Sequence, residues 1–306
     1  MSSTAVVIVS YRSEAEAAAS ARSVSEDPEV AEVLIVDNSA DEQRVDRVAF
    51  EGLGDRVTVI SAQRNLGYAA GNNLGIRAAV DAGHEFVLVL NPDVDPAPGT
   101  VRALLDVLLA DDAVQIVSPA LVETYRGDAD TVLRSPGFDL LLGRGLLTAP
   151  RSGRFESTFF GAAFLARSRC FEQHGVLDED LFLYCEEVEF VSRMRRHGER
   201  PGFRVAADVH VQHGRGGTVS PDGYEGTARS TVAYEQASRS VIVFGRKYHR
   251  RRVWLWTLAR LVMAARLAVR DRGAATAVVR GLVAGLRVPV SSSGRRRRRE
   301  RKRPSP

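Results

Sequence analysis

Four short apolar runs in the first third of the chain constrain its fold more than any other feature. Each run is rich in β-branched residues and continuously apolar, which is typical of strands that are buried on both faces. Segments with helical periodicity lie between the runs and after the last one. The strand candidates are Ala5–Val9, Val33–Val36, Val57–Ile60 and Phe86–Leu90, and the helix candidates are Glu14–Val24, 43–50, Asn72–Ala82 and Gly99–Ala110. This alternation predicts an α/β fold with a mostly parallel sheet flanked by helices.

Length, composition and missing motifs narrow the class of protein. The 306 residues are 44% hydrophobic and 26% charged, which is ordinary for a globular protein and excludes a disordered chain. Two cysteines, Cys170 and Cys185, are too few for a disulfide framework, and their spacing matches no zinc motif. No G-x-G-x-x-G motif follows the first run and no G-x-x-x-x-G-K-[ST] motif is present. These absences argue against a dinucleotide dehydrogenase and a P-loop ATPase.

The mild net charge of +4 is the average of two opposed regions. Residues 1–244 contain 23 basic and 36 acidic residues, a net −13, whereas residues 245–306 contain 19 basic and 2 acidic residues, a net +17. We therefore predict an acidic globular domain over 1–244, a basic amphipathic helical region over 245–290 and a disordered Arg-rich tail over 291–306. The first residues lack the features of a signal peptide, and no stretch approaches the roughly 18 apolar residues of a spanning helix. We expect the body to fold in the cytoplasm.

Polar residues follow each of the four apolar runs, at the point where each predicted strand ends. In open α/β sheets, ligands bind at the carboxyl ends of the strands, so these residues are expected to line a ligand site. General loop polarity would explain any one of them, but it explains four together less well. The segments are Ser10-Tyr11-Arg12, Asp37-Asn38-Ser39, Arg64-Asn65-Leu66-Gly67 and Asn91-Pro92-Asp93-Val94-Asp95. A nucleoside diphosphate could be held there through a metal ion that bridges carboxylates and phosphates.

The last of these segments is the best candidate for a metal site. Mg²⁺ and Mn²⁺ prefer oxygen ligands and commonly use one or two carboxylates together with substrate phosphates. Asp93 is the first candidate ligand and Asp95 the second. The alternative is a Pro-Asp turn that ends the strand and caps the next helix.

Two further segments carry candidate chemistry. Glu186 and Glu187 begin a predicted helix that ends at Gly198, where they could face a cleft and deprotonate a hydroxyl, or simply complement the helix dipole. His210 and His213 precede a Gly-rich loop, where an imidazole could bind a metal and Arg215 a phosphate; a surface loop with a spare histidine is the alternative.

Taken in order, these motifs resemble the family 2 glycosyltransferases, and most closely the rhamnosyltransferase-like branch of the inverting GT-A enzymes. The resemblance spans about two-thirds of the chain, from Ala5 to Thr218. It is carried by S-Y, V-L-I-V-D-N-S, R-N-x-G-Y-A-A-G-N-N-x-G, L-N-P-D-V-D-P, F-F-G-A-A, F-x-Y-x-E-E-x-E and H-x-x-G-G-T. It implies a GT-A fold and transfer of a sugar from a nucleotide-diphospho donor.

The resemblance also implies a role for individual residues. The nucleoside and donor pocket would comprise Ser10, Tyr11, Asp37, Asn38, Arg64, Asn65, Gly67, Asn72 and Asn91. Asn91-Pro92-Asp93 stands where the family has its metal-binding D-x-D motif, so Asp93 would be the main carboxylate ligand. Glu187 matches the acceptor base, with Glu186 beside it, and His213 matches a histidine that completes the metal site, with His210 as its rival. Phe159–Ala162 matches the acceptor-side strand.

The implied reaction is a direct displacement with inversion and without a covalent enzyme intermediate. The cofactor would be Mg²⁺ or Mn²⁺, the sugar L-rhamnose, and the acceptor a polyprenyl-linked or cell-surface glycan in cell-wall or polysaccharide biosynthesis. Two alternatives remain: a family 2 transferase of another sugar, such as galactofuranose or N-acetylglucosamine, and a non-catalytic nucleotide- or polyanion-binding protein.

The basic end of the chain predicts a membrane contact. On a helical wheel Arg252, Arg266 and Arg270 fall within about 40° of one another, and the remaining face is apolar. This pattern favours a helix in the membrane interface with Trp254 and Trp256 at headgroup level, followed by a second helix over Ala274–Leu286. The alternative is a helix that packs on the enzyme body. No nucleic-acid partner is expected, because no stacking platform accompanies the arginines, and we expect a protein peripheral to the inner face of the cell membrane.

Overall fold

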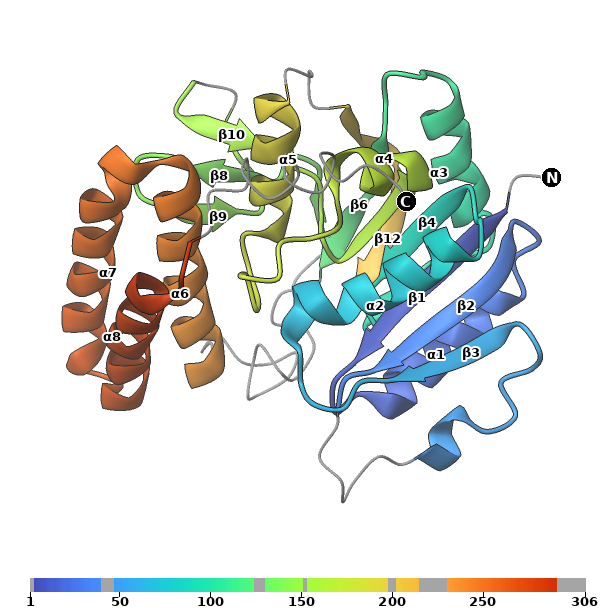
Figure 1. Cartoon of the computed structure of the whole chain (residues 1–306), viewed down its shortest axis with the longest axis horizontal. Helices are drawn as coiled ribbons and strands as arrows, with labels where there is room; N and C mark the ends of the chain where they lie inside the picture. Colours follow the sequence, from blue (N-terminus) through green and yellow to red (C-terminus); the bar gives the residue numbers. More distant parts are fainter. Residues whose placement is uncertain are drawn as a thin grey trace, which may run out of the picture.

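A curled sheet of nine strands forms the centre of the described part of the chain (Figure 1). The computed structural model describes residues 3–39, 47–123, 130–150, 153–197, 202–214 and 230–290. The strands in spatial order are β3 (Val57–Ser61), β2 (Val30–Asp37), β1 (Thr4–Ser10), β4 (Phe86–Leu90), β11 (Ala163–Arg167), β6 (Ile116–Glu123), β12 (Phe203–His213) and β5 (Val94–Asp95), with β7 (Thr131–Leu133) beside β6.

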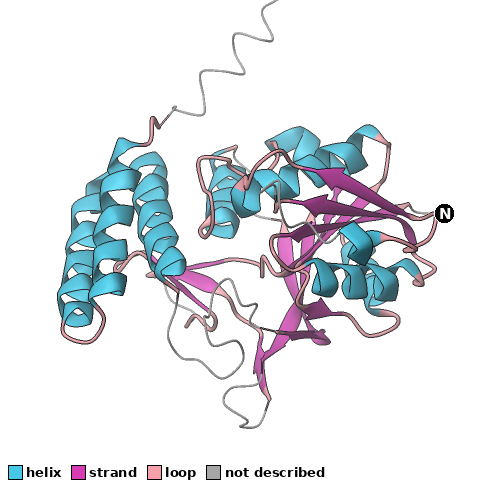
Figure 2. Cartoon of the chain, turned by 90° about the horizontal axis from the view of Figure 1, so that it is seen from below, coloured by secondary structure: helices cyan, strands magenta, loops and turns pink. Residues whose placement is uncertain are grey.

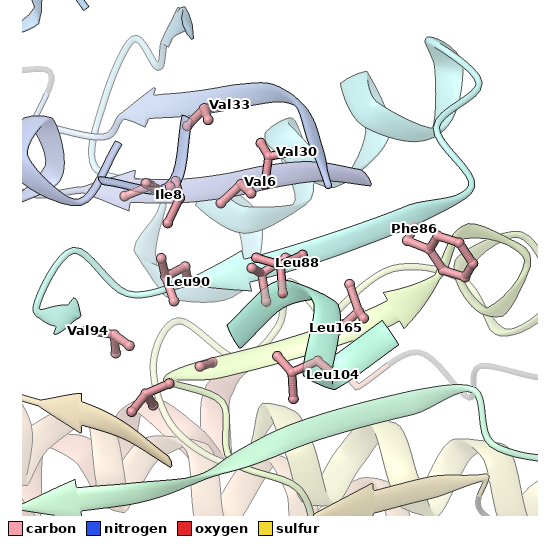
Figure 3. Close-up of a cluster of buried hydrophobic side chains, with 14 of the residues drawn as sticks. Val6, Ile8, Val30, Val33, Phe86, Leu88, Leu90, Val94, Leu104 and Leu165 are labelled. Carbon is pink, nitrogen blue, oxygen red and sulfur yellow. The ribbon is translucent and has the colours of Figure 1, made fainter. Parts of the chain in front are cut away.

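The four predicted strands are confirmed as β1 to β4, and they pair in parallel. Alternate residues of these strands enter two hydrophobic cores, one on each face of the sheet. Val6 and Ile8 pack with helices α1 (Glu14–Ser25) and α3 (Thr100–Leu109) in the core shown in Figure 3. On the opposite face Val7 packs with α2 (Gly67–Asp81), α4 (Ser168–His174) and α5 (Glu186–Arg196). The burial of both faces explains why the runs are continuously apolar.

Strand β3 departs from this expectation. It was predicted to be buried on both faces, but it lies at the edge of the sheet and Val59 is 43% exposed. An edge strand has only one neighbour, so its side chains are covered less completely than those of β1 and β2.

The other predicted helices agree in type with the structure but differ in their limits, and one prediction fails. Helix α2 begins five residues before the predicted start, and its first turn therefore includes Gly67 and Tyr68. The predicted helix over 43–50 is a 3₁₀ turn over Arg47–Phe50, and residues 43–46 lie outside the described residues. Strand β11 runs antiparallel between β4 and β6, so the sheet is parallel from β3 to β4 and mixed beyond it.

Three C-terminal helices form a group at one end of the molecule (Figures 1 and 2). They are α6 (Thr231–Tyr248), α7 (Val253–Ala268) and α8 (Arg272–Arg287), with a 3₁₀ turn over Arg250–Arg252 before α7. The group packs on a small sheet formed by β8 (Gly137–Asp139), β9 (Arg144–Leu146) and β10 (Phe155–Ser157). The predicted boundary between the domain over 1–244 and the basic region over 245–290 falls inside α6, which is continuous there. This boundary stays a prediction.

The prediction that Trp256 lies at lipid headgroups is wrong. Trp256 is fully buried, packs against Phe138 and Phe244, and donates its indole N–H to the Leu140 carbonyl at 3.1 Å. Arg260 on the same face donates to the Gly143 carbonyl at 2.7 Å. One face of α7 therefore packs on the body, as the alternative proposed.

The opposite face of α7 is exposed and apolar. Trp254 is 67% exposed, and Leu258, Leu261 and Val262 are 44–50% exposed. Their spacing places them along a single stripe of the helix. Within the described residues no helix is long and apolar enough to cross a membrane.

Candidate active site

The ends of β1 and β2 place the predicted nucleoside-binding residues side by side. The main-chain N–H of Asn38 donates to the Ser10 carbonyl at 2.8 Å. Ser10, Asp37 and Asn38 are all buried at this edge. Tyr11 is half-buried, with the guanidinium of Arg12 5.3 Å from its ring centroid. The parallel pairing of β1 and β2 brings these residues together, because equivalent ends of parallel strands meet at one edge.

Asn38 joins this edge to the loop before α2. Its side-chain amide donates to the Gly67 carbonyl at 3.1 Å, and its carbonyl oxygen accepts the Leu66 N–H at 2.9 Å. Asn65 accepts the Gly67 N–H at 2.9 Å and lies 3.3 Å from the Asn38 amide. The two predicted donor-binding loops therefore form one hydrogen-bonded unit.

Two other predicted donor residues are placed differently. Arg64 is exposed at the start of this loop. Asn72 is buried inside α2, and its amide donates to the Tyr68 carbonyl at 2.9 Å, one helical turn back. Its side chain therefore supports the helix in this structure.

The candidate metal ligands Asp93 and His213 face each other across the ends of β5 and β12. Asp93 Oδ2 lies 3.8 Å from Nε2 of His213, and the Asp93 carbonyl accepts the Gly214 N–H at 2.8 Å. Nδ1 of His213 lies 3.0 Å from the buried carboxylate of Glu123. Burial opposes protonation, but the Glu123 hydrogen bond and the Asp93 charge together raise the pKa of His213. A carboxylate that holds one imidazole nitrogen while the other faces a second carboxylate suits a divalent metal.

The rival candidates lie apart from this pair. His210 is exposed on β12, with Nε2 3.3 Å from Arg134. Asp95 is exposed on β5, and Asn91 follows β4, where its N–H donates to the Ala162 carbonyl at 2.8 Å. No cluster of three or more His, Cys, Asp or Glu side chains that could hold a metal is present among the described residues. Arg215, the proposed phosphate ligand, and the glycines at 216 and 217 lie outside the described residues.

The predicted acid pair stands at the N-terminus of α5. Glu186 is buried and Glu187 half-buried, and the two residues before them, Tyr184 and Cys185, have φ of 74° and 72°. Burial and the charge of Glu187 raise the pKa of Glu186 well above its ordinary value. Burial also raises the pKa of Glu187, and backbone N–H donors, including that of Gly161, oppose this rise. Burial and mutual repulsion therefore disfavour two negative charges at the start of α5.

Three residues to which sequence analysis gave no individual role complete the site: Glu123, described above, Gly161 and Tyr68. A Cβ built on Gly161 would lie 2.0 Å from Oε1 of Glu187, so this carboxylate lies directly over the glycine. The phenol of Tyr68 donates to the Gly161 carbonyl at 2.6 Å. Burial, followed by the charges of Glu187, Glu186 and Asp93, raises the pKa of Tyr68 well above its ordinary value. The carbonyl of Ala162, next to Gly161, accepts the N–H of Asn91, so the acid pair and the Asp93 segment border one site.

The sequence held a signal for two of these residues. Tyr68 lies within the R-N-x-G-Y motif and Gly161 within F-F-G-A-A, so both fell in segments already singled out. Glu123, the partner of His213, carries no local signal, because it ends an ordinary apolar strand 90 residues away in the chain.

Structural comparison defines the fold. The chain resembles the mannosyltransferase PcManGT from Pyrobaculum calidifontis, solved with GDP-Man and Mn²⁺, with a TM-score of 0.55 and 15% identity over 92% of this chain and 86% of that one. It also resembles GalNAc-T7, solved with UDP, GalNAc and Mn²⁺, with a TM-score of 0.53 and 16% identity over 69% of this chain and 43% of that one. The chain has the GT-A fold, as predicted.

Sequence comparison defines the family. The model of glycosyl transferase family 2 matches residues 5–168, more than half of the chain. The chain is 30% identical over 68% of its length to the low-salt glycan biosynthesis hexosyltransferase Agl10 of Haloferax volcanii. It is 28% identical over 52% of its length to the N-acetylglucosaminyl-diphospho-decaprenol L-rhamnosyltransferase of Mycobacterium tuberculosis. The chain belongs to glycosyl transferase family 2, and the alignments span 66% and 61% of the two relatives.

Proposed function

We propose that this protein transfers a sugar from a nucleotide-diphospho donor to an acceptor hydroxyl, with inversion at the anomeric carbon. The observation that carries the proposal is geometric: Glu187 lies over Gly161, and the next residue, Ala162, accepts the N–H of Asn91, two residues before Asp93. A proton acceptor and a carboxylate that could hold a diphosphate-binding metal then border one site. Direct displacement requires both groups: one to activate the nucleophile and one to stabilise the departing diphosphate.

Glu187 is the acceptor base in this mechanism. Its carboxylate is held by the Gly161 N–H, and in its ionised form it takes the proton of the acceptor hydroxyl as the oxygen attacks. Asp93 and His213 would hold Mg²⁺ or Mn²⁺, which supplies positive charge to the leaving diphosphate when bound. The unit built around Asn38 and Asn65 would hold the nucleoside.

For the substrates, we propose L-rhamnose as the sugar and a polyprenyl-diphosphate-linked saccharide as the acceptor. The support is the similarity to a protein named as an N-acetylglucosaminyl-diphospho-decaprenol L-rhamnosyltransferase. A test is a thermal-shift screen of UDP-, dTDP- and GDP-sugars with Mn²⁺, followed by transfer assays with the donor that stabilises the protein most. Preference for dTDP-rhamnose supports the proposal. Preference for a UDP- or GDP-sugar contradicts rhamnose as the transferred sugar and identifies the donor used instead.

The alternative of a non-catalytic binding protein predicts a different result. Such a protein would bind nucleotide without transferring or hydrolysing the sugar. Assays with Mn²⁺ and with a chelator separate the two functions, because we expect metal-dependent turnover. The joint presence of Asp93, Glu187 and His213 in one site favours the enzyme.

The metal assignment predicts the effect of removing one carboxylate. We expect Asp93→Asn to raise the Mn²⁺ concentration needed for half-maximal nucleotide binding at least about tenfold, because a charged oxygen ligand is lost. The measurement is a Mn²⁺ titration of nucleotide binding by calorimetry. Asp106→Asn, on the exposed face of α3, is the control, and Asp95→Asn tests the second candidate. An unchanged titration in Asp93→Asn would remove this residue from the ligand set.

We also propose that the protein is peripheral to the cytoplasmic face of an anionic membrane, where it meets its acceptor. The support is the net +17 of residues 245–306 together with the exposed stripe of Trp254, Leu258, Leu261 and Val262 on α7. A helix with an apolar face and neighbouring arginines binds at the interface of an anionic bilayer. Figure 1 shows α7 at the outer side of the C-terminal group.

This proposal predicts that replacing the apolar residues of the α7 stripe by serine impairs binding to vesicles. We expect the triple variant Trp254→Ser, Leu258→Ser, Leu261→Ser to lower partitioning onto phosphatidylglycerol-containing vesicles at least about tenfold, because it removes apolar contact area. The measurement is vesicle co-sedimentation. A control triple variant changes exposed apolar residues outside the stripe, Val59→Ser, Leu109→Ser and Leu147→Ser. Equal binding by both triple variants would contradict the assignment of this face.

A further inference from the structure

Helix α6 contacts the turn that precedes the acceptor base. This turn, residues 178–185, leads directly into α5. Ser240, which is fully buried on α6, donates its hydroxyl to the Leu183 carbonyl at 2.7 Å. The neighbouring Arg239 donates to the Asp180 carbonyl at 2.9 Å. Both bonds hold backbone carbonyls of the turn, and therefore fix its path rather than a single side chain.

A second set of contacts lies two helical turns further along α6. Nζ of Lys247 lies 2.5 Å from a carboxylate oxygen of both Asp178 and Asp180, and the Lys247 side chain is only 8% exposed. The next residue, Tyr248, donates its phenol to Glu189 at 2.5 Å, in the first turn of α5. Helix α6 thus contacts the start of the turn, its end and the first turn of α5.

The turn needs external support because its backbone is strained. Tyr184 and Cys185 have φ of 74° and 72°, in the left-handed region that residues with a side chain rarely adopt. Such conformations cost energy and persist where the surroundings determine them. The side chain of Cys185 packs in the same hydrophobic core as Val241 and Phe244 of α6.

The other side of the turn contacts the donor loop. The Tyr68 N–H donates to the Phe182 carbonyl at 2.7 Å, and a Cβ on Gly67 would lie 2.3 Å from that oxygen. The turn is therefore enclosed between the family-defining part of the chain and α6. The family model ends at residue 168, so α6 lies outside the matched region.

We propose that helix α6 sets the position of the acceptor base, with Ser240 and Lys247 as positioning residues. The inference rests on the proposed function, because it assigns α6 to the catalytic role of Glu187. Loss of either contact lets the turn relax and moves Glu187 away from the acceptor hydroxyl. Donor affinity should change less than kcat, because the nucleoside unit has its own hydrogen bonds around Asn38 and meets the turn at its edge, at the Phe182 carbonyl.

The test compares Ser240→Ala and Lys247→Met with Ser238→Ala in the full-length chain. Ser238 is an equally buried serine on the same helix, but its hydroxyl donates to the Tyr234 carbonyl within α6. The control therefore makes the same chemical change without touching the turn. We expect the two test variants to lower kcat about tenfold or more, with a smaller change in donor affinity, and the control to match the wild type.

A further readout separates positioning from a general loss of stability. Hydrogen exchange of peptides over residues 178–190 should be about tenfold faster in both test variants and unchanged in the control. Exchange can be measured even if no acceptor is found, so failure of the proposed function would not obscure this result.

The proposal is overturned by either of two outcomes. One is exchange at the turn that is equal in all four proteins. The other is faster exchange with unchanged kcat, which would mean that α6 holds the turn without setting the base.

Discussion

Replacement of Glu187 by glutamine is expected to lower the rate of sugar transfer by about 10³-fold or more, with donor affinity unchanged. Glutamine keeps the size of the side chain but cannot accept the proton of the acceptor hydroxyl. The measurements are kcat with saturating donor and the donor dissociation constant from calorimetry. The matched control is Glu172→Gln, an exposed carboxylate on α4. Near-normal turnover in Glu187→Gln would remove the base from the mechanism.

The raised pKa of Glu187 gives this prediction a pH dependence. The ionised carboxylate is the active form, so kcat should fall as the pH drops through a value above the ordinary glutamate pKa. A raised carboxyl pKa contributes stability at low pH, and that stability is lost as the pH rises through the folded-state value. Glu187→Gln should therefore be at least as thermally stable as the wild type at neutral pH. A large fall in its melting temperature would contradict this account of its burial.

Replacement of Gly161 by alanine is expected to lower kcat by about 10²-fold without unfolding the protein. The new Cβ would lie 2.0 Å from Oε1 and 2.9 Å from Cδ of Glu187, so the carboxylate must move. The atom displaced is the far end of a flexible side chain, and the free energy of unfolding should change by less than about 1 kcal/mol. The measurements are kcat, donor affinity and thermal denaturation.

Gly145→Ala is the matched control for this variant, because a Cβ at Gly145 meets open space. We expect the control to match the wild type in all three measurements. If Gly161→Ala kept full activity, Glu187 would have to work from a different position. If it lost donor affinity instead, the turn before β11 would belong to the donor pocket.

The sheet and its functional edge could be predicted because their signals are local. A strand covered on both faces must be apolar throughout, and a polar residue after such a strand marks its end. Asp37 and Asn38 illustrate this rule, since they follow the run Val33–Val36 and lie at the end of β2. The same rule fails for Val57–Ile60, because an apolar run does not reveal whether a strand has neighbours on both sides.

The two tryptophans of α7 show where local pattern stops being sufficient. Trp254 and Trp256 are two residues apart and chemically identical, yet one is 67% exposed and the other is fully buried. The helical wheel identified an apolar helix with arginines but could not show which sector faces the small sheet. Contacts with Leu140 and Gly143, more than 100 residues away in the chain, decide it.

The sequence by itself determined the α/β alternation, the residues at the strand ends, and the family to which their order belongs. These properties depend on residues that are neighbours in the chain. Only the tertiary structure decided that Glu123 holds His213, that Gly161 lies under Glu187, and that α6 holds the turn before the base. Each of these contacts joins segments far apart in the chain, and packing of the whole sheet brings them together. The opposed charges of the two regions were visible in the sequence, but the buried face of α7 emerged only from packing.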